Sequence, residues 1–524
     1  MKRPIFLTVA TALVLAGCGK DSIQTTAPGS ATDYSEAEFD RTVAVVFSPS
    51  GDATVTGTGS GQTVTVSGNG VTIVNSGSEA VRYRLSGTTT NGYLKIYSPS
   101  VQAIELQGVS LTNPTGAAIN LQGPESKPSQ GVTTWLVLGG SSSVADGATY
   151  TAPANADEDQ KGTIFAEGPI VISGDGSLTV TSQGRCGLAS DDYVCLNSGT
   201  VVIASSASTS VSGTDTIKIS ALKSKDNFEV NGGSLTITAT GTGAKGISGD
   251  GTAHFNGGKV SVVVSGSNFG SSSHQGGNPW WQSSSDGVSA KGIKFDGDIT
   301  FDGAVVSASS TNHEAIESKS NITVNSGEIY AYSTADDAIN ASQNITITGG
   351  NVCAHSTAND GLDANANIYI QGGLIYAIGA SAPEEAIDVN INETPGVELV
   401  VSGGVIIAIG GLSRGATLDQ ACYQASSWST NTWYALTVGG TVYAFKTPTS
   451  GGSPLVVSGA NTLSSGVSVS GGTTLFGGNM NVGGTLSASG TAVTLSAYSG
   501  GNSGGGPGGG GHGPWGHKTK PTGR

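Results

Sequence analysis

Hydrophobic residues recur at a fixed interval through the middle of the chain. Three columns of aliphatic residues and one column of glycines keep a step of 23 positions, with one step of 25 near the end. Columns that stay in register over several repeats are typical of a solenoid, in which each unit stacks on the next. The columns are Ile293, Ile316, Ile339, Leu362 and Ile387; Ile299, Ile322, Ile345 and Ile368; Ile329, Val352 and Ile375; and Gly327, Gly350 and Gly373.

Each repeat contains three short runs of β-forming residues separated by turn residues, and no repeat has room for a helix. In one unit the runs are Ala338–Asn340, Asn344–Ile347 and Asn351–Ala354. Three strands in about 23 residues predict one coil of an all-β fold, the right-handed, single-stranded parallel β-helix. In such a fold, the aliphatic columns point inward and equivalent residues form ladders along the axis.

The repeat register extends upstream more weakly and ends before the C-terminus. Leu222 and Ile247 keep the context of Ile293, and the extra length before Ile293 holds a Gly/Ser-rich loop at residues 265–286. We expect coils over residues 42–411 and a small β-rich cap over residues 412–498, because an array needs its open end covered. Residues 18–41 are polar and residues 499–524 are glycine-rich, which predicts a tether and a disordered tail.

Composition excludes several classes of protein. The chain of 524 residues has 82 glycines without a three-residue period, which excludes collagen, and it has no heptads, which excludes a coiled coil. Glycine, serine and threonine also disfavour long helices. A net charge of −15 repels phosphate backbones, so we expect no nucleic-acid partner.

The N-terminus predicts export and a lipid anchor. Lys2 and Arg3 precede a short apolar run, which is too short to span a bilayer and is typical of a cleavable signal over residues 1–17. The following Leu-Ala-Gly-Cys resembles the lipobox of bacterial lipoproteins, in which the cysteine, here Cys18, carries the lipid. We expect secretion across the inner membrane and anchoring at the outer membrane or cell surface, the alternative being an ordinary signal with an incidental cysteine.

Four further cysteines include no CxxC pair, so zinc and thioredoxin-like chemistry have no support. Disulfides form outside the cytoplasm, and the pair closest in sequence, Cys186 and Cys195, is the predicted one.

Acidic residues, which are rare in this chain, concentrate at fixed positions around the first aliphatic column. Four consecutive coils therefore stack carboxylates at one edge, about 5 Å apart, where like charges repel. Calcium removes that repulsion best, because it accepts six to eight carboxylate and amide oxygens in irregular geometry. The alternative is a solvated acidic face. The candidate ligands are Glu314, Glu317, Asp336, Asp337, Asn359, Asp360, Asp363, Glu384, Glu385 and Asp388.

Basic and aromatic residues near the acidic stack suggest a sugar ligand. Lys245 and Lys291 stand at the equivalent position in the two preceding coils, where they would hold a polyanion, act as a base, or merely relieve acidic repulsion. Trp280 and Trp281 in the 265–286 loop suit stacking on a pyranose ring or a lid over a neighbouring coil. A sugar-stacking face is also possible at Tyr330, Tyr332, Tyr369 and Tyr376.

Four segments resemble a signature of the calcium-binding, pectate-lyase-like β-helix carbohydrate-binding proteins of bacterial surfaces: residues 285–294, 336–341, 359–363 and 383–388. The resemblance spans residues 43–411 and implies binding of cellulose and acidic sugar polymers without established catalysis. It implies calcium ligands at Asp336, Asp337, Asn359, Asp360, Asp363, Glu384, Glu385 and Asp388. His313 departs from the family pattern, which leaves the outermost calcium position open.

Three functions are compatible with these observations. The first is non-catalytic polysaccharide binding by a calcium-stabilised, lipid-anchored protein. The second is a calcium-dependent lyase acting on uronate polymers, with Lys245 or Lys291 as the base. The third is a structural or adhesive surface protein without a sugar ligand.

Overall fold

The computed structural model describes residues 39–153, 155–270, 287–391 and 394–500, and in these residues the fold is all-β, as predicted. Strands run from β1 (Arg41–Phe47) to β50 (Ser496–Tyr498). A three-residue 3₁₀ turn, η2 (Phe476–Gly478), is the one helical element among them. Within the same residues, no helix has the length and hydropathy that crossing a membrane requires.

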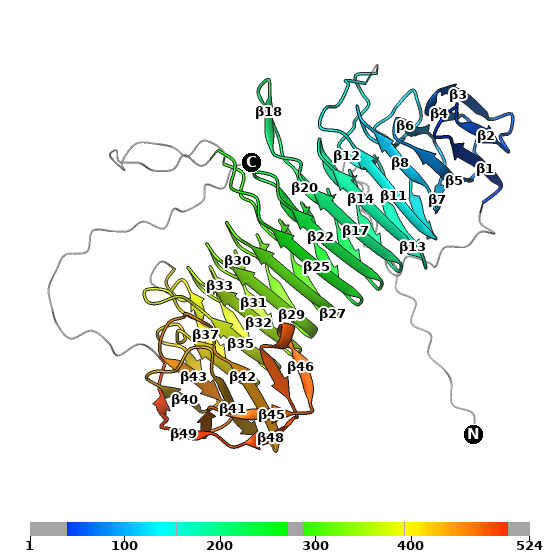
Figure 1. Ribbon diagram of the computed structural model, residues 1–524. Coiled ribbons are helices and arrows are strands. Elements are labelled where there is room, and N and C mark those ends of the chain that lie inside the picture. Colours follow the sequence, from blue (N-terminus) through cyan, green and yellow to red (C-terminus); the bar gives the residue numbers. More distant parts are fainter. Residues whose placement is uncertain (1–38, 154, 271–286, 392–393, 501–524) are drawn as a thin grey trace, which may run out of the picture. The chain divides into compact units, whose positions relative to one another are not determined.

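One sheet of thirteen strands begins with the antiparallel hairpin β3–β4 and then takes one strand from each successive repeat (Figure 1). Its strands are parallel from β4 onward, and they pair in chain order. The strands are β3 (Gln62–Ser67), β4 (Asn69–Asn75), β6 (Gly92–Tyr97), β9 (Ile119–Gln122), β12 (Gly162–Ala166), β15 (Cys186–Ser190), β20 (Ser220–Ser224), β23 (Lys245–Gly249), β26 (Ile293–Phe295), β28 (Ile316–Ser318), β30 (Ile339–Ala341), β33 (Leu362–Ala364) and β36 (Ile387–Val389).

A second sheet of twenty-seven strands contains two parallel series that follow each other in every repeat. β27 (Ile299–Ser310) and β29 (Ile322–Ser333) run through both series, since β29 pairs with β31 (Ile345–Ile347) and with β32 (Asn351–Ser356). The first series continues with β34 (Ile368–Ile370) and β37 (Leu399–Val401), and the second with β35 (Leu374–Ile378) and β38 (Val405–Ile409).

The predicted columns are confirmed by this register. Ile293, Ile316 and Ile339 are direct neighbours on adjacent strands, and the other two aliphatic columns pair in the same way. All members of the three columns are between 0 and 2 % exposed and belong to one continuous core. The glycine column lies at the bend between the two series, where Gly327 and Gly350 have φ of 102° and 75°, a region that costs other residues energy.

Side-chain ladders reinforce the stacking of repeats. In the core, the rings of Phe255 and Phe301 stack at 5.0 Å between centroids. At a surface turn, the Asn344 amide donates to Asn321 Oδ1 at 3.1 Å, and the Asn367 amide donates to Asn344 Oδ1 at 3.0 Å. The asparagine ladder repeats the 23-residue step, so the same turn recurs along the sheet.

The C-terminal part forms antiparallel sheet that packs against the last repeats. β43 (Leu455–Ser458) pairs antiparallel with β38. β41 (Trp433–Val438) and β42 (Thr441–Lys446) pair with each other. In addition, β41 pairs with β44 (Leu463–Ser465), and β42 pairs with β47 (Met480–Val482). The Tyr376 ring of β35 lies 5.6 Å from the Phe445 ring of β42. β43 therefore extends the second sheet beyond β38, and β42 contacts the outward face of that sheet.

The predicted disulfide between Cys186 and Cys195 is wrong, because both cysteines are free and buried. Cys186 lies in β15 of the thirteen-stranded sheet, where it packs with Phe165 and Ala189. Cys195 lies in β16 (Val194–Leu196) of the other sheet. The chain thus turns from one sheet to the other between them.

Candidate cation site at the edge of the thirteen-stranded sheet

The stacked acids lie at and just before strands β28, β30, β33 and β36. Register makes Glu317, Asn340, Asp363 and Asp388 successive neighbours across these strands. Before the strands, Asp337 Oδ1 accepts a hydrogen bond from the Asp360 N–H at 3.2 Å. The structure therefore brings together the acids that the 23-residue period aligned.

Three carboxylates at the C-terminal end of the stack form the tightest acidic group. Asp360, Asp363 and Asp388 each place an oxygen within 4.8 Å of the other two. The Asn340 amide donates to Asp363 Oδ2 at 2.6 Å and to Asp337 Oδ2 at 3.2 Å, which links a fourth carboxylate to the group. Asp363 Oδ1 is buried without a hydrogen-bond partner.

Burial and mutual repulsion make the charged form of these carboxyls unfavourable. Burial, followed by the charge of Asp388, raises the pKa of Asp363 to about 8, and the same causes raise the pKa of Glu385 to about 8. Burial and neighbouring carboxylates also raise the pKa values of Asp337 and Asp360 well above their usual range. These oxygen ligands fit a calcium ion, which would compensate their charge and coordinate the unpartnered Asp363 oxygen.

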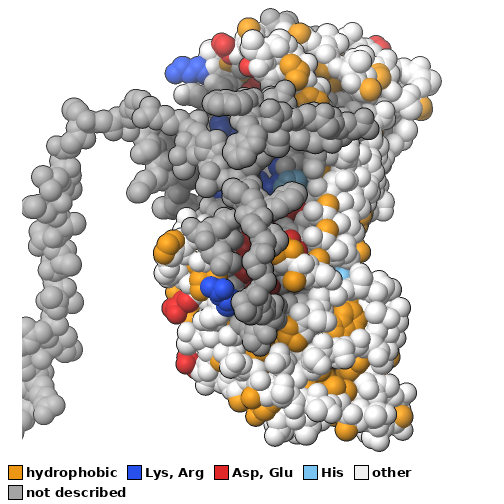
Figure 2. All heavy atoms as spheres, turned by 90° about the vertical axis from the view of Figure 1, so that its left-hand side faces the viewer, with side chains coloured by type: hydrophobic (Ala, Val, Ile, Leu, Met, Phe, Trp, Pro, Cys, Tyr) orange, Lys and Arg blue, Asp and Glu red, His pale blue; other side chains and the backbone are white. Residues whose placement is uncertain are grey.

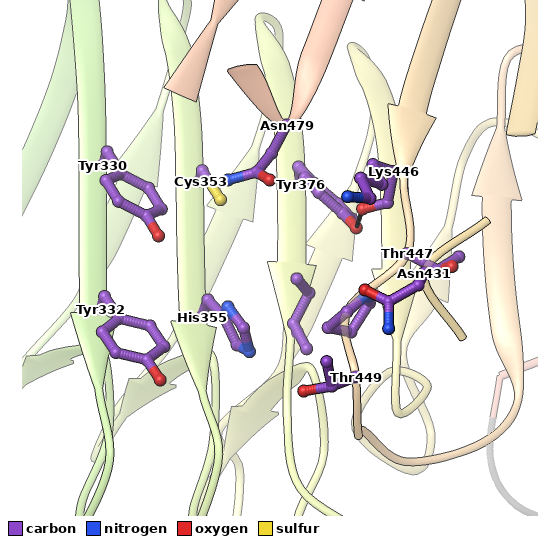
Figure 3. Close-up of a pocket in the computed structure, with 12 residues that line it drawn as sticks. Tyr330, Tyr332, Cys353, His355, Tyr376, Asn431, Lys446, Thr447, Thr449 and Asn479 are labelled. Carbon is purple, nitrogen blue, oxygen red and sulfur yellow. Dashed lines mark hydrogen bonds between the residues drawn. The ribbon is translucent and has the colours of Figure 1, made fainter. Parts of the chain in front are cut away.

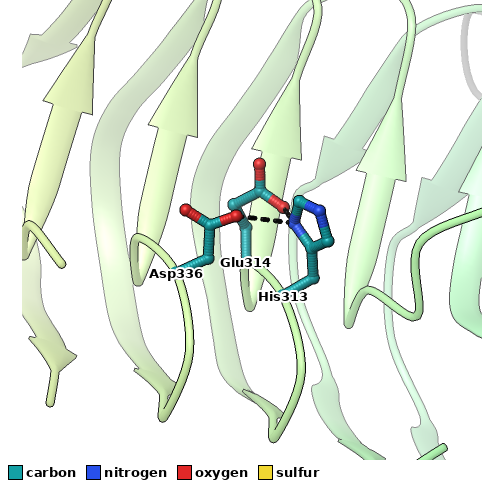
Figure 4. Close-up of side chains that lie close together, drawn as sticks. All are labelled: His313, Glu314 and Asp336. Atoms are coloured by element: carbon teal, nitrogen blue, oxygen red, sulfur yellow. Dashed lines mark hydrogen bonds and ion pairs between the residues drawn. The ribbon is translucent and has the colours of Figure 1, made fainter. Parts of the chain in front are cut away.

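The N-terminal end of the stack carries its own positive charges. His313 Nδ1 lies 2.8 Å from Asp336 Oδ2 and also contacts the Glu314 carboxylate, so both carboxylates point toward one imidazole ring (Figure 4). Lys291 Nζ lies 3.0 Å from Glu314 Oε2 and contacts Glu317 as well. Burial alone would raise the pKa of Glu314, but Lys291 and His313 lower it to about 2.

The predicted ladder of ligands therefore has two electrostatically different ends. Glu314, Glu317 and Asp336 pair with basic side chains, whereas the group around Asp363 is acidic. Glu385 belongs to the acidic end, because its N–H donates to Asp360 Oδ1 at 2.5 Å. The Asn359 amide instead donates to Asp336 Oδ1 at 3.0 Å, at the end that pairs with His313. Both Glu384 and Glu385 are half-buried in the turn before β36.

Comparison with known proteins places the chain in a family. A family profile described as "Carbohydrate-binding domain-containing protein" matches residues 60–356. The chain belongs to this family. Among solved structures, one similar chain is described as "Structure of the polysaccharide lyase-like protein from C. thermocellum, Gadolinium derivative"; it is 18% identical, with a TM-score of 0.36, over 58% of this chain and 96% of that chain. No curated protein matches the sequence.

In this carbohydrate-binding domain protein, the two predicted basic residues differ in their surroundings. Lys291 is 4 % exposed and is held by two carboxylates, which raise its pKa although burial opposes them. Lys245, the first residue of β23, is half-buried, and burial followed by the charges of Lys291 and Lys294 lowers its pKa to about 8. Of the two, Lys245 is the one whose pKa is lowered toward neutral pH. Lys291 instead relieves acidic repulsion.

A second group of carboxylates escaped the sequence analysis because it does not follow the 23-residue step. Asp159, Glu167 and Asp191 lie within 4.8 Å of one another through their ligand atoms, and Lys161 Nζ lies 2.7 Å from Asp159 Oδ2. Burial, followed by Asp191 and Asp159, raises the pKa of Glu167 to about 7. These residues share a position relative to their strands: Glu167 comes directly after β12, and Asp191 comes directly after β15, which pairs with β12. That shared position is the signal that could have identified this group.

The structure brings together three of the four tyrosines that were predicted to form a sugar-stacking face. Tyr330, Tyr332 and Tyr376 line one pocket, whereas Tyr369 lies on β34 in the other series of strands. Trp280, Trp281 and Cys18 lie outside the described residues.

Charged side chains are sparse on the face drawn in Figure 2, where white and orange surface predominates among the described atoms, in keeping with 12 % charged residues.

Proposed function

We propose that this protein is a calcium-stabilised, non-catalytic polysaccharide-binding protein built on a right-handed parallel β-helix. The β-helix is supported by the two sheets, in which successive repeats add strands to three parallel series, at a 23-residue step where the repeat is most regular. Membership of a carbohydrate-binding domain family supports the polysaccharide ligand. A C-terminal β cap would cover the last coil through β43 and the strands that follow it.

The calcium proposal rests on one observation, the close group of carboxylates around Asp363, whose buried Oδ1 atom has no hydrogen-bond partner. Asp360, Asp363 and Asp388 would hold the ion, with Asp337 and Glu385 beside them and Asp336, Asn359 and Glu384 at the margin. When bound, calcium supplies positive charge and coordination positions beyond those that three carboxylates fill, and sugar oxygens suit these positions. The basic residue Lys245 lies several strands away along the same sheet and adds positive charge that favours an acidic polymer.

Binding of polygalacturonate tests this proposal. With calcium present, wild-type protein is expected to be retained on the immobilised polymer, and Asp363→Asn is expected to weaken calcium-dependent retention about 10- to 100-fold, a range seen for altered metal sites. Asp250→Asn serves as the matched control, because Asp250 is exposed and outside the acidic group. Retention that is equal in EDTA and in calcium would contradict the proposal, and no retention of any polymer would favour a structural or adhesive role.

A lyase is the second candidate, because the lowered pKa of Lys245 gives one amine the proton affinity of a general base. In that reaction the neutral amine would take the proton beside the uronate carboxylate, and the leaving oxygen would depart with its bonding electrons. Incubating the protein with polygalacturonate and calcium tests this reaction, because its unsaturated products absorb ultraviolet light. Products that disappear in Lys245→Met would replace the non-catalytic proposal with the lyase.

We further propose that Cys18 carries a lipid that holds the protein at the outer membrane or cell surface after secretion. The support is the apolar N-terminal run followed by Leu-Ala-Gly-Cys. Wild-type protein is expected to incorporate a labelled fatty acid and enter the detergent phase, whereas Cys18→Ser is expected to do neither. A labelled Cys18→Ser protein would refute the anchor.

A further inference from the structure

A pocket of about 290 Å³ lies where the last repeats meet the C-terminal strands (Figure 3). Its floor comes from three adjacent strands, β29, β32 and β35, and its wall comes from residues next to β41, β42 and β47. The floor residues are Tyr330, Tyr332, Cys353, His355, Tyr376 and Ile378. The wall residues are Asn431, Lys446, Thr447, Pro448, Thr449 and Asn479.

Aromatic rings on the floor form an ordered platform. Tyr330 and Tyr332 project from the same face of β29, and both are half-buried (Figure 3). The Tyr332 ring meets the His355 ring edge to face at 5.0 Å between centroids. Tyr376 donates its hydroxyl hydrogen to the Lys446 carbonyl oxygen at 2.7 Å, which fastens the wall to the floor. The pocket is therefore held open by packed and hydrogen-bonded side chains.

The lining of this pocket is not acidic, in contrast to the group of carboxylates around Asp363. None of the twelve lining residues in the described part of the chain is acidic, and Lys446 is the one lysine or arginine among them. Burial lowers the pKa of His355 to about 4, so its ring is neutral at pH 7. His355 Nε2 is buried without a hydrogen-bond partner. Amide and hydroxyl groups of Asn431, Asn479 and Thr449 supply the other polar lining.

An uncharged strip of the second sheet leads up to the two tyrosines. Two outward-facing rows run across β14 (Ser177–Ser182), β17 (Thr200–Ser205), β22 (Ser234–Ala239), β25 (Lys259–Val264) and β27, in register with Tyr330 and Tyr332. All ten residues have small, uncharged side chains, and all are half-buried or exposed. The rows are Thr179, Val202, Thr236, Ser261 and Ser307, and Thr181, Ala204, Thr238, Val263 and Ser309.

We propose that this pocket binds one pyranose ring of an uncharged glycan, whose chain continues over the Ser/Thr-rich rows. Tyrosine rings offer apolar faces for the C–H face of a sugar, and convergent amide and hydroxyl groups in a pocket orient its hydroxyls. The side chains of the rows beyond the pocket carry no charge that an uncharged chain would have to desolvate. This inference rests on the proposed polysaccharide-binding function, but it uses a surface that requires no calcium.

Titration calorimetry with cellohexaose and hexagalacturonate tests the pocket. Tyr332→Ala is expected to weaken cellohexaose binding at least tenfold, while Tyr332→Phe, which keeps the ring, retains binding within about threefold. Tyr369→Ala is the matched control, because Tyr369 is also a half-buried strand tyrosine but lies outside the pocket. EDTA is expected to leave cellohexaose binding unchanged while it abolishes retention on polygalacturonate, so failure at the calcium site is distinguishable from failure here.

The rows are tested with Thr238→Glu, which places a charge on a small exposed position two strands before β27. It is expected to weaken binding of cellohexaose more than binding of cellobiose, because only the longer ligand reaches beyond the pocket. Cellohexaose binding that is unchanged in Tyr332→Ala, at an unchanged melting temperature, would overturn the proposal. So would binding confined to hexagalacturonate and lost in Lys446→Gln, which would make the pocket specific for acidic sugars.

Discussion

In calcium-free buffer, the protein is expected to lose thermal stability as the pH rises from about 4 to about 8, and added calcium is expected to restore it. The folded-state pKa values of Asp363 and Glu385, about 8, lie above the ordinary values of 3.8 and 4.5. A raised carboxyl pKa gives stability that is fully present below the unfolded-state pKa and is lost as the pH rises through the folded-state pKa. The expected loss at pH 8 is on the order of 3 kcal/mol, because the carboxyls titrate together and share the repulsion.

Thermal melting at pH 5 and pH 8, with calcium and with EDTA, measures this effect. Asp363→Asn is expected to raise the melting temperature in EDTA at pH 8, because it removes a buried charge, and to reduce the gain from calcium. Asp250→Asn, at an exposed position, is expected to change neither value. Melting temperatures in EDTA that are the same at pH 5 and pH 8 would support a solvated acidic face instead.

The parts of the fold that follow the 23-residue step were predictable from sequence, because a direct repeat converts spacing into neighbouring positions on adjacent strands. Ile316 pairs with Ile339 and Asn340 pairs with Asp363, as the period requires. The same logic aligned the acids. Relief of acidic repulsion was one of three roles that the sequence left open for Lys291, and His313 was not among the candidates. The choice depends on which way long side chains turn once they are buried.

Features that join distant parts of the chain had no such signal. The pocket depends on Lys446 and Asn479, and the hydrogen bond from Tyr376 to Lys446 spans 70 positions. No repeat connects these residues, so only the packing of the C-terminal sheet brings them together. The disulfide prediction failed for the opposite reason, because sequence proximity between Cys186 and Cys195 conceals a turn from one sheet into the other.

Lys291→Met is expected to destabilise the protein by about 3–5 kcal/mol, the usual result of removing one partner from a buried ion pair. Lys291 is 4 % exposed between Glu314 and Glu317, which are 6 % and 1 % exposed. In the wild type, Lys291 and His313 hold the pKa of Glu314 at about 2 against burial, so this pair stabilises the fold above pH 4.5. Without the ammonium group, that pKa rises, and the destabilisation is expected to be larger at pH 8 than at pH 5.

Chemical denaturation of a small set of variants isolates the cause of this loss. Lys291→Met combined with Glu314→Gln is expected to recover part of the stability, because it removes one of the carboxylates left without its partner. Lys294→Met is the matched control, since Lys294 pairs with Asp296, whose side chain is 47 % exposed, and surface pairs contribute about 1 kcal/mol or less. If Lys291→Met costs no more than Lys294→Met, then water reaches the buried pair, and Lys291 is available to a ligand rather than committed to the acidic stack.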